Sequence, residues 1–123
     1  MGSNWTDDEL RRIGDATELR IAGRRQDGTL RDLVTIWQVR IEDQIYVRSV
    51  RGHDAAWYRG TQLRGEGAIE SGGLRKDVDF VLDDSRDAEI DAAYASKYGR
   101  GSEGVRRITS ATAAATTLRL DPR

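Results

Sequence analysis

Cysteine is absent from this chain of 123 residues, and histidine occurs once, at position 53. Without cysteine the chain has no disulfide, no thiolate metal ligand and no thiol nucleophile. With one histidine it has no multi-histidine metal site, and a serine, histidine and aspartate triad could form only around His53. We therefore expect no metal site, and the thiol-dependent and multi-histidine zinc enzyme classes are excluded.

Long apolar runs and an excess of one charge are also missing. No stretch approaches the ~20 apolar residues that a membrane-spanning helix needs, and the first residues lack the pattern of a secretory signal. The 20 basic and 21 acidic residues nearly cancel, which argues against an overall nucleic-acid-binding surface. We expect a cytoplasmic protein whose partners include neither membranes nor nucleic acids.

The composition that remains is typical of one soluble domain. Hydrophobic residues make up 37% of the chain and charged residues 33%, short of the disordered class. A chain of this length can bury one core without covalent cross-links. We interpret residues 1–123 as a single domain, with a helical arm over 1–17 and a barrel with inserted helices over 18–123.

The arm carries a helix-start signal. Thr6 followed by Glu9 is the pattern of a capping box, in which each side chain caps the other residue's backbone N–H. Trp5 precedes the cap as a hydrophobic staple, and Leu10 and Ile13 form one apolar face. This pattern predicts a short helix that ends at residues 14–15.

Strands are predicted from alternating or continuous apolar patterns. The segment 33–41 is apolar on both faces around residues 34–37, which predicts one long strand that is covered on two sides. Because few helices are available as a cover, we expect a second subunit to supply it. Further strands are predicted over 18–22, 44–50, 67–71, 74–82 and 116–120.

Two more helices are predicted, one with Asp54 as its N-cap and one after possible caps at 83–85. The mostly polar segment 101–110 is predicted to be a loop. About six strands with two or three short helices indicate a mainly β fold, a small and partly closed antiparallel barrel with peripheral helices. The alternative is a monomeric α+β domain with the same strand order.

Arginines gather near two turns. Arg24, Arg25 and Arg31 flank an Asp-Gly turn at 27–28, and Arg51 lies between a strand end and a helix start, where backbone N–H groups attract anions. Guanidinium groups hold phosphate through paired, charge-assisted hydrogen bonds. The four arginines are therefore a candidate phosphate site, and the alternative is a solvated basic hairpin tip.

Three residues are candidates for acid–base catalysis. Histidine is the usual proton-transfer group near neutral pH, and Asp54 beside His53 is a possible partner. Tyr58 lies one helical turn further on. The alternative is that His53 and Asp54 serve only as surface or capping groups.

A flat ring system needs apolar walls and a polar contact at its edge. Trp37 and Tyr58 are candidates for the walls, and Ser49 and Tyr98 for the edge. Core packing explains the aromatic residues equally well.

Several segments together resemble known families. They are the basic, glycine-containing segment 23–31, the run from His53 to Tyr58, the triplet 97–99 and the segment 117–120. Their order resembles the FMN-binding split-barrel superfamily, within it the deazaflavin-dependent nitroreductase-like proteins, and most closely a bacterial domain family of unknown function. The resemblance implies a split-barrel homodimer that holds FMN or a deazaflavin, or no cofactor, in a groove between the subunits.

The chain departs from the nitroreductase-like pattern at two places. Asp32-Leu33 stands where a proline is usual, and Arg59-Gly60-Thr61 where an asparagine is usual. Three functions therefore stay open: a flavin- or deazaflavin-dependent oxidoreductase, a cofactor-free cyclase or isomerase of small-molecule metabolism that uses the same groove, and a non-catalytic ligand-binding module.

Overall fold

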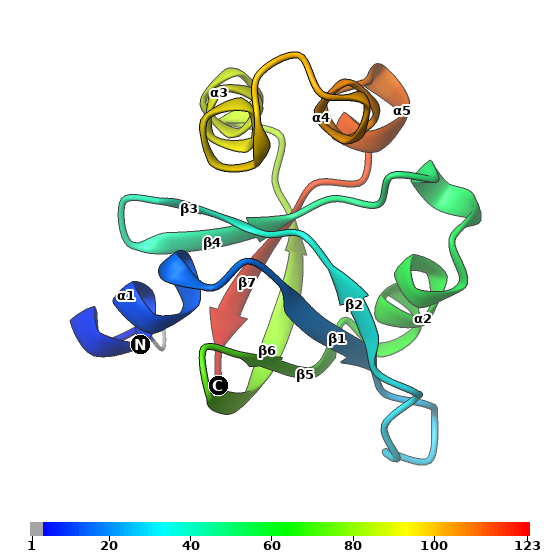
Figure 1. Cartoon of the computed structure of the whole chain (residues 1–123). Coiled ribbons are helices and arrows are strands. Elements are labelled where there is room, and N and C mark those ends of the chain that lie inside the picture. Colours follow the sequence, from blue (N-terminus) through cyan, green and yellow to red (C-terminus); the bar gives the residue numbers. More distant parts are fainter. Residues whose placement is uncertain (1–3) are drawn as a thin grey trace.

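The computed structural model describes residues 4–123 as one curled β-sheet with helices around it (Figure 1). In the view of Figure 1, three helices gather beyond one end of the sheet, and the C-terminal end of the chain lies on the opposite side. The elements in chain order are α1 (Asp7–Asp15), β1 (Leu19–Gly23), β2 (Val34–Ile36), β3 (Val39–Ile41), β4 (Gln44–Val47), the 3-10 turn η1 (Gly52–Asp54), α2 (Ala56–Arg64), β5 (Glu66–Ser71), β6 (Leu74–Leu82), α3 (Asp87–Tyr98), α4 (Glu103–Ile108), α5 (Ala111–Ala114) and β7 (Leu118–Pro122).

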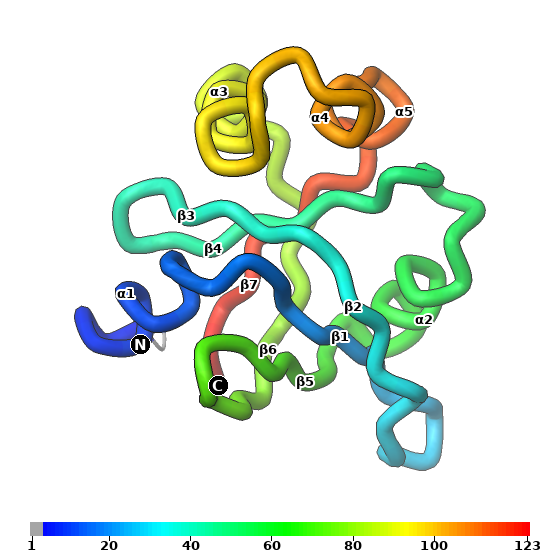
Figure 2. The backbone as a smooth tube through the Cα atoms, viewed as in Figure 1, coloured from blue at the N-terminus to red at the C-terminus, as the bar shows by residue number. Residues whose placement is uncertain are grey.

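The seven strands form one antiparallel sheet in the order β2-β1-β5-β6-β7-β4-β3. Strands β2 and β3 follow each other in the chain but lie at opposite edges of this sheet, with only Trp37 and Gln38 between them. Three peptide steps span at most about 11 Å, so the two edges must lie close together. The sheet is thus a half-barrel whose open side is crossed by the chain itself, as the tube in Figure 2 shows. The predicted mainly β, partly closed antiparallel barrel is confirmed.

The prediction of one continuous strand over 33–41 is wrong. Strand β2 pairs with β1 and ends at Ile36, whereas β3 begins at Val39 and pairs with β4. The apolar residues of β3, Val39 and Ile41, are buried in a cluster with residues of α3. The chain's own helix therefore covers β3, whereas β2, for which we expected cover from a partner subunit, is an edge strand with Val34 exposed.

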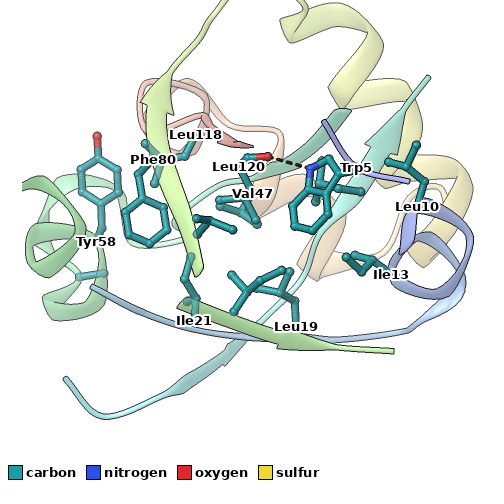
Figure 3. Packing of buried hydrophobic residues seen from close by; sticks show 14 residues of the cluster. Trp5, Leu10, Ile13, Leu19, Ile21, Val47, Tyr58, Phe80, Leu118 and Leu120 are labelled. Carbon is teal, nitrogen blue, oxygen red and sulfur yellow. Dashed lines mark hydrogen bonds between the residues drawn. The ribbon is translucent and has the colours of Figure 1, made fainter. Parts of the chain in front are cut away.

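The main core fills the inside of the curled sheet (Figure 3). Helix α1 contributes Leu10 and Ile13, which confirms the predicted apolar face. Trp5 is more than a staple, because its buried indole N–H donates to the carbonyl oxygen of Leu120 at 2.9 Å. This bond joins the predicted arm to β7, the last strand in the chain.

A second core lies between the opposite face of the sheet and the three helices beyond it. Tyr46 of β4 is buried there with Ile90 and Tyr94 of α3 and Ile108 of α4. Because β4 is covered on both faces, polar side chains near its end are also taken out of water.

Helix starts agree with the sequence in part. The capping box of Thr6 and Glu9 is present at α1 and confirms that prediction. Asp54 is not the N-cap of α2: it lies in the 3-10 turn η1, and Ala55 occupies the cap position without a side-chain bond. The N-cap of α3 is Arg86, which also caps without a side-chain bond, so the predicted caps at 83–85 are wrong.

The predicted loop over 101–110 is wrong as well, because most of it forms helix α4. Ser102 caps this helix by accepting from the Val105 N–H, and Val105 and Ile108 are buried. None of the helices in residues 4–123 has the length and apolar character needed to cross a membrane.

Candidate ligand-binding site

The cavity with the most apolar lining, which we call the main cavity, lies between the edge strand β2, the end of β4 and the helices α2 and α4. Its volume is about 510 Å³, within the range of small-molecule sites. Two tryptophans and the aliphatic residues of β2 provide an apolar wall, and two exposed arginines lie on the lining. The residues that line it are Val34, Thr35, Ile36, Trp37, Arg48, Ser49, Val50, Arg51, Ala55, Ala56, Trp57, Gly104, Arg107 and Ile108.

The Trp37 ring is held in place on two sides. It stacks on Tyr98 with a centroid distance of 4.0 Å and an interplanar angle of 7°. Its other contact is Gly104 of α4, where a Cβ atom would lie 2.6 Å from the Trp37 ring. A side chain at position 104 would therefore displace the indole, so glycine is needed for the aromatic wall.

Tyr98 supports this wall from behind and does not line the cavity. Its hydroxyl accepts from the Gln38 N–H at 3.2 Å and donates to the Thr17 carbonyl oxygen at 2.7 Å. Burial raises the pKa of the Tyr98 hydroxyl. Its proton is thus held in a structural bond at the crossing between the sheet edges, and the predicted contact with a ring edge is not available to it.

Ser49 stands on the cavity lining just beyond β4. Its backbone N–H donates to the Thr116 hydroxyl at 2.8 Å, which fixes its position. The Ser49 Oγ atom is buried and has no hydrogen-bond partner within residues 4–123. An unpaired buried hydroxyl costs free energy of about 1–3 kcal/mol, which a polar ligand atom would recover.

Arg48 lies beside Ser49 and also lines the cavity, but its charge is fully used by the protein. Its buried guanidinium forms ion pairs with Asp87 and Asp91 of α3. It also donates to the Thr117 hydroxyl at 2.9 Å and to the Ile108 carbonyl oxygen at 3.2 Å. Arg48 therefore attaches α3 and α4 to the end of β4 and keeps the helical side of the cavity in place.

Arg51 and Arg107 are the cations free to meet a ligand. Both are exposed and line the cavity. Arg106 is paired with Glu103, whereas neither the Arg51 nor the Arg107 guanidinium has an ion-pair or hydrogen-bond partner in the part of the chain that the structure describes. An anionic group on a ligand would find unengaged guanidinium donors there.

The three hairpin arginines lie away from this cavity. Arg24 donates to the Gly28 carbonyl oxygen and pairs with Asp77, and Arg25 donates to the Leu30 carbonyl oxygen at 2.8 Å. The Arg31 side chain rests against Gly60 of α2. The structure therefore does not bring Arg24, Arg25 and Arg31 together with Arg51.

The predicted acid–base residues are also outside the lining. His53 and Asp54 are exposed in η1, and the His53 ring meets the edge of Tyr58 at a centroid distance of 5.4 Å. Tyr58 is buried in the main core beside Phe80 (Figure 3), and burial raises the pKa of its hydroxyl. Of the predicted site residues, the cavity gathers Trp37, Ser49 and Arg51.

Sequence reasoning missed three residues that shape the cavity: Arg48, Gly104 and Arg107. Gly104 and Arg107 fall in the segment interpreted as a loop, although Ser102 and the spacing of Val105 and Ile108 were signals of a helix. Nothing in the local pattern marks Arg48 as buried. Its burial results from its place directly after β4, where the helices α3 and α4 pack over the chain.

The fold also occurs in other proteins. Three solved structures share it at low sequence identity: a conserved hypothetical protein from Mycobacterium tuberculosis (9% identity, TM-score 0.63, 95% of this chain and 79% of that one), an "F420 Reductase" (13%, 0.58, 97% and 94%) and a candidate 5-nitroimidazole antibiotic resistance protein from Bacteroides thetaiotaomicron (12%, 0.57, 95% and 78%). The chain therefore has the same split-barrel fold as these three proteins, and the predicted fold is confirmed.

The family follows from the sequence itself. The model described as "Uncharacterized protein conserved in bacteria (DUF2255)" matches residues 9–120, and the chain belongs to this bacterial family. No curated protein sequence matches the chain.

Proposed function

We propose that this protein binds a flavin or deazaflavin in the main cavity and acts as an oxidoreductase. The observation that carries the proposal is the buried, unpartnered hydroxyl of Ser49 on the lining of an otherwise apolar cavity. The same cavity combines a flat aromatic wall with unengaged arginines, which suits a ring system that bears an anionic group. The fold shared with an "F420 Reductase" supports the same class of cofactor.

Each part of such a cofactor has a candidate residue. Trp37 would face the ring, because stacking on Tyr98 and contact with Gly104 hold the indole in one orientation. The Ser49 hydroxyl would bond a polar atom of the ring, and Arg51 and Arg107 would hold the phosphate. When bound, the cofactor supplies hydride transfer, and the residues around it bind and orient it and exclude water.

Nothing in the cavity favours the cyclase or isomerase alternative. That function depends on an acid or base in the groove, whereas His53 and Asp54 are exposed outside the lining and Tyr58 is buried in the main core.

A non-catalytic ligand-binding module would use the same cavity and the same arginines. Turnover separates it from an oxidoreductase: the protein should accelerate electron transfer from the reduced cofactor to an acceptor such as a nitroimidazole.

The proposal is tested by adding FMN and, separately, a deazaflavin cofactor at tens of micromolar, a usual range for metabolite affinities. We expect a change in visible absorption and a higher melting temperature for at least one of them. The effect should weaken with added salt, because the phosphate contacts are electrostatic. Riboflavin, which lacks the phosphate, is the matched control and should bind more weakly. No change with either cofactor would contradict the proposal.

The homodimer stays a prediction. Its original reason, two apolar faces on a long strand, applies only to the edge strand β2, where Val34 is 38% exposed. We propose that a second copy would cover this edge of the cavity. Analytical ultracentrifugation at micromolar concentration tests it: a single species of 13.8 kDa would contradict a dimer.

A further inference from the structure

A second, smaller pocket lies on the other side of the crossing between β2 and β3. It encloses about 330 Å³ and is lined by Gly14, Asp15, Val39, Arg40, Ala93, Ser96 and Lys97. Lys97 is one of two lysines in the chain and comes from the last turn of α3. This pocket shares no lining residue with the main cavity.

The Lys97 amine is held by two backbone acceptors. Its Nζ atom donates to the Gly14 carbonyl oxygen at 3.1 Å and to the Gln38 carbonyl oxygen at 3.2 Å. A neutral amine has two N–H groups, which match these two acceptors. In that form every donor is used, and the nitrogen lone pair stays without a protein partner.

Burial and the nearby charges decide whether the Lys97 amine is charged or neutral. Burial lowers the pKa of the Lys97 amine to about 8, and Asp15 opposes this change in part. Arg40 of β3 faces the same pocket, and the ring of Tyr98 lies 5.3 Å from Nζ. Near neutral pH a tenth of such amines are neutral, whereas an ordinary lysine is almost entirely charged.

We propose that Lys97 is a nucleophilic amine that captures small aldehydes bearing a carboxylate as a reversible imine in this pocket. The nitrogen forms a bond to the aldehyde carbon, and the carbonyl oxygen leaves as water together with the two amine protons. Uptake of one proton from solvent gives the cationic imine, whose N–H donates to a backbone carbonyl and whose charge is stabilised by Asp15 and by the carbonyl end of α1.

Arg40 gives the pocket its preference for an acid. Its side chain lies against Gly14, where a Cβ atom would be 3.2 Å from the Arg40 Cδ, and Gly14 is also the residue whose carbonyl accepts from Lys97. The aliphatic part of Arg40 and the Lys97 amine thus lie around one residue. The Arg40 Nε donates to the Glu42 carbonyl oxygen at 2.6 Å, and its terminal N–H groups have no partner within residues 4–123. A carboxylate on the aldehyde would meet Arg40 while the aldehyde carbon meets Lys97.

The test uses glyoxylate at pH 7, with cyanoborohydride to trap the imine and peptide mapping to locate it. Lys76 is the internal control, because it lies on β6 in an ion pair with Glu9 at 2.8 Å. The lower pKa of Lys97 raises the fraction of neutral amine but also makes that amine a weaker nucleophile. The two effects offset each other in part, so we expect Lys97 to be trapped roughly tenfold faster than Lys76. Equal trapping of both lysines, or faster trapping of Lys76, would overturn the proposal.

Two further arms keep the result independent of folding. In the unchanged protein, the trapping rate at Lys97 should rise with pH and level off above about 8, whereas a rate that keeps rising to pH 10 would contradict a neutral amine near pH 7. Lys97→Arg keeps a cation for the two carbonyls and should leave only Lys76 and the chain's α-amino group to react. Arg40→Gln should remove the advantage of glyoxylate over acetaldehyde; an unchanged advantage would overturn the assignment of an acid.

Discussion

Two regions of the molecule carry arginines in opposite states. In the hairpin between β1 and β2, Arg24 and Arg25 donate to backbone carbonyl oxygens of the turn that they flank. At the cavity, Arg51 and Arg107 are exposed and unengaged within residues 4–123. Arg24 and Arg25 stabilise the loop, whereas Arg51 and Arg107 keep their donors for an anion. The number of cations in a segment therefore says less about binding than the number of carbonyl acceptors within their reach.

The largest expected effect concerns Arg48, which is buried in the wall of the cavity. Arg48→Met should lower the free energy of unfolding by about 3–5 kcal/mol, because it removes the buried partner of Asp87 and Asp91 and leaves polar groups unpaired. Arg24→Met removes a pair with an exposed aspartate and should cost about 0–1 kcal/mol. Urea unfolding followed by circular dichroism gives both values. If the two variants lost similar amounts of unfolding free energy, the contrast between the buried Arg48 and the exposed hairpin arginine would be contradicted.

The second effect concerns binding. Replacing Arg51 and Arg107 together by alanine should weaken FMN binding roughly tenfold or more, since each charge-assisted bond contributes at most about 1.5–3 kcal/mol and exposure reduces it. The matched control is the pair Arg24→Ala and Arg25→Ala, for which we expect affinity within about twofold of the unchanged protein. Fluorescence titration of FMN measures both variants. If the hairpin pair weakens binding more than the cavity pair, the phosphate lies at the hairpin instead.

A smaller effect with two opposite signs is expected at Ser49. Ser49→Ala should weaken ligand binding several-fold, by about 1 kcal/mol, because one hydrogen bond is lost. It should leave the free energy of unfolding unchanged or slightly higher, because the hydroxyl has no partner in the protein. Melting curves with and without ligand separate the two effects. A large loss of stability in the ligand-free protein would show that Ser49 has a structural partner.

The smallest effect should come from His53. Because this side chain is exposed and outside the cavity, His53→Ala should change stability by no more than about 0.5 kcal/mol and leave FMN affinity unchanged within about twofold. Turnover with an electron acceptor should also be unchanged. A loss of turnover of tenfold or more with normal binding would restore His53 as an acid–base residue.

Local signals predicted the parts of the fold that depend on neighbouring residues. The capping box at Thr6 and the hairpin of β5 and β6 are both present. They were predictable because the cap and the turn depend on residues that are close in the sequence. The break at Trp37 and Gln38 was not predictable in this way. Its cause is the curl of the whole sheet, which places the partners of β2 and β3 at opposite edges.

The same limit applies to the candidate site. Trp37, Ser49 and Arg51 were found because aromatic, hydroxyl and cationic groups near strand ends are typical of ligand sites. Tyr58 was misplaced because its neighbours do not show that it points into the core. Arg48 was missed because its burial results from α3 and α4, which are distant in the sequence and pack over the end of β4.

The central claim is that a flavin-type ring binds against Trp37. The chain has three tryptophans, so a ¹H–¹⁵N spectrum should show three indole N–H signals. Trp37 and Trp57 line the cavity, and Trp5 is the internal reference because its N–H is buried and bonded to Leu120. On addition of FMN or a deazaflavin, assigned with Trp→Phe variants, the Trp37 and Trp57 signals should shift while the Trp5 signal stays in place. A bound cofactor that leaves the Trp37 and Trp57 signals unchanged would contradict the claim.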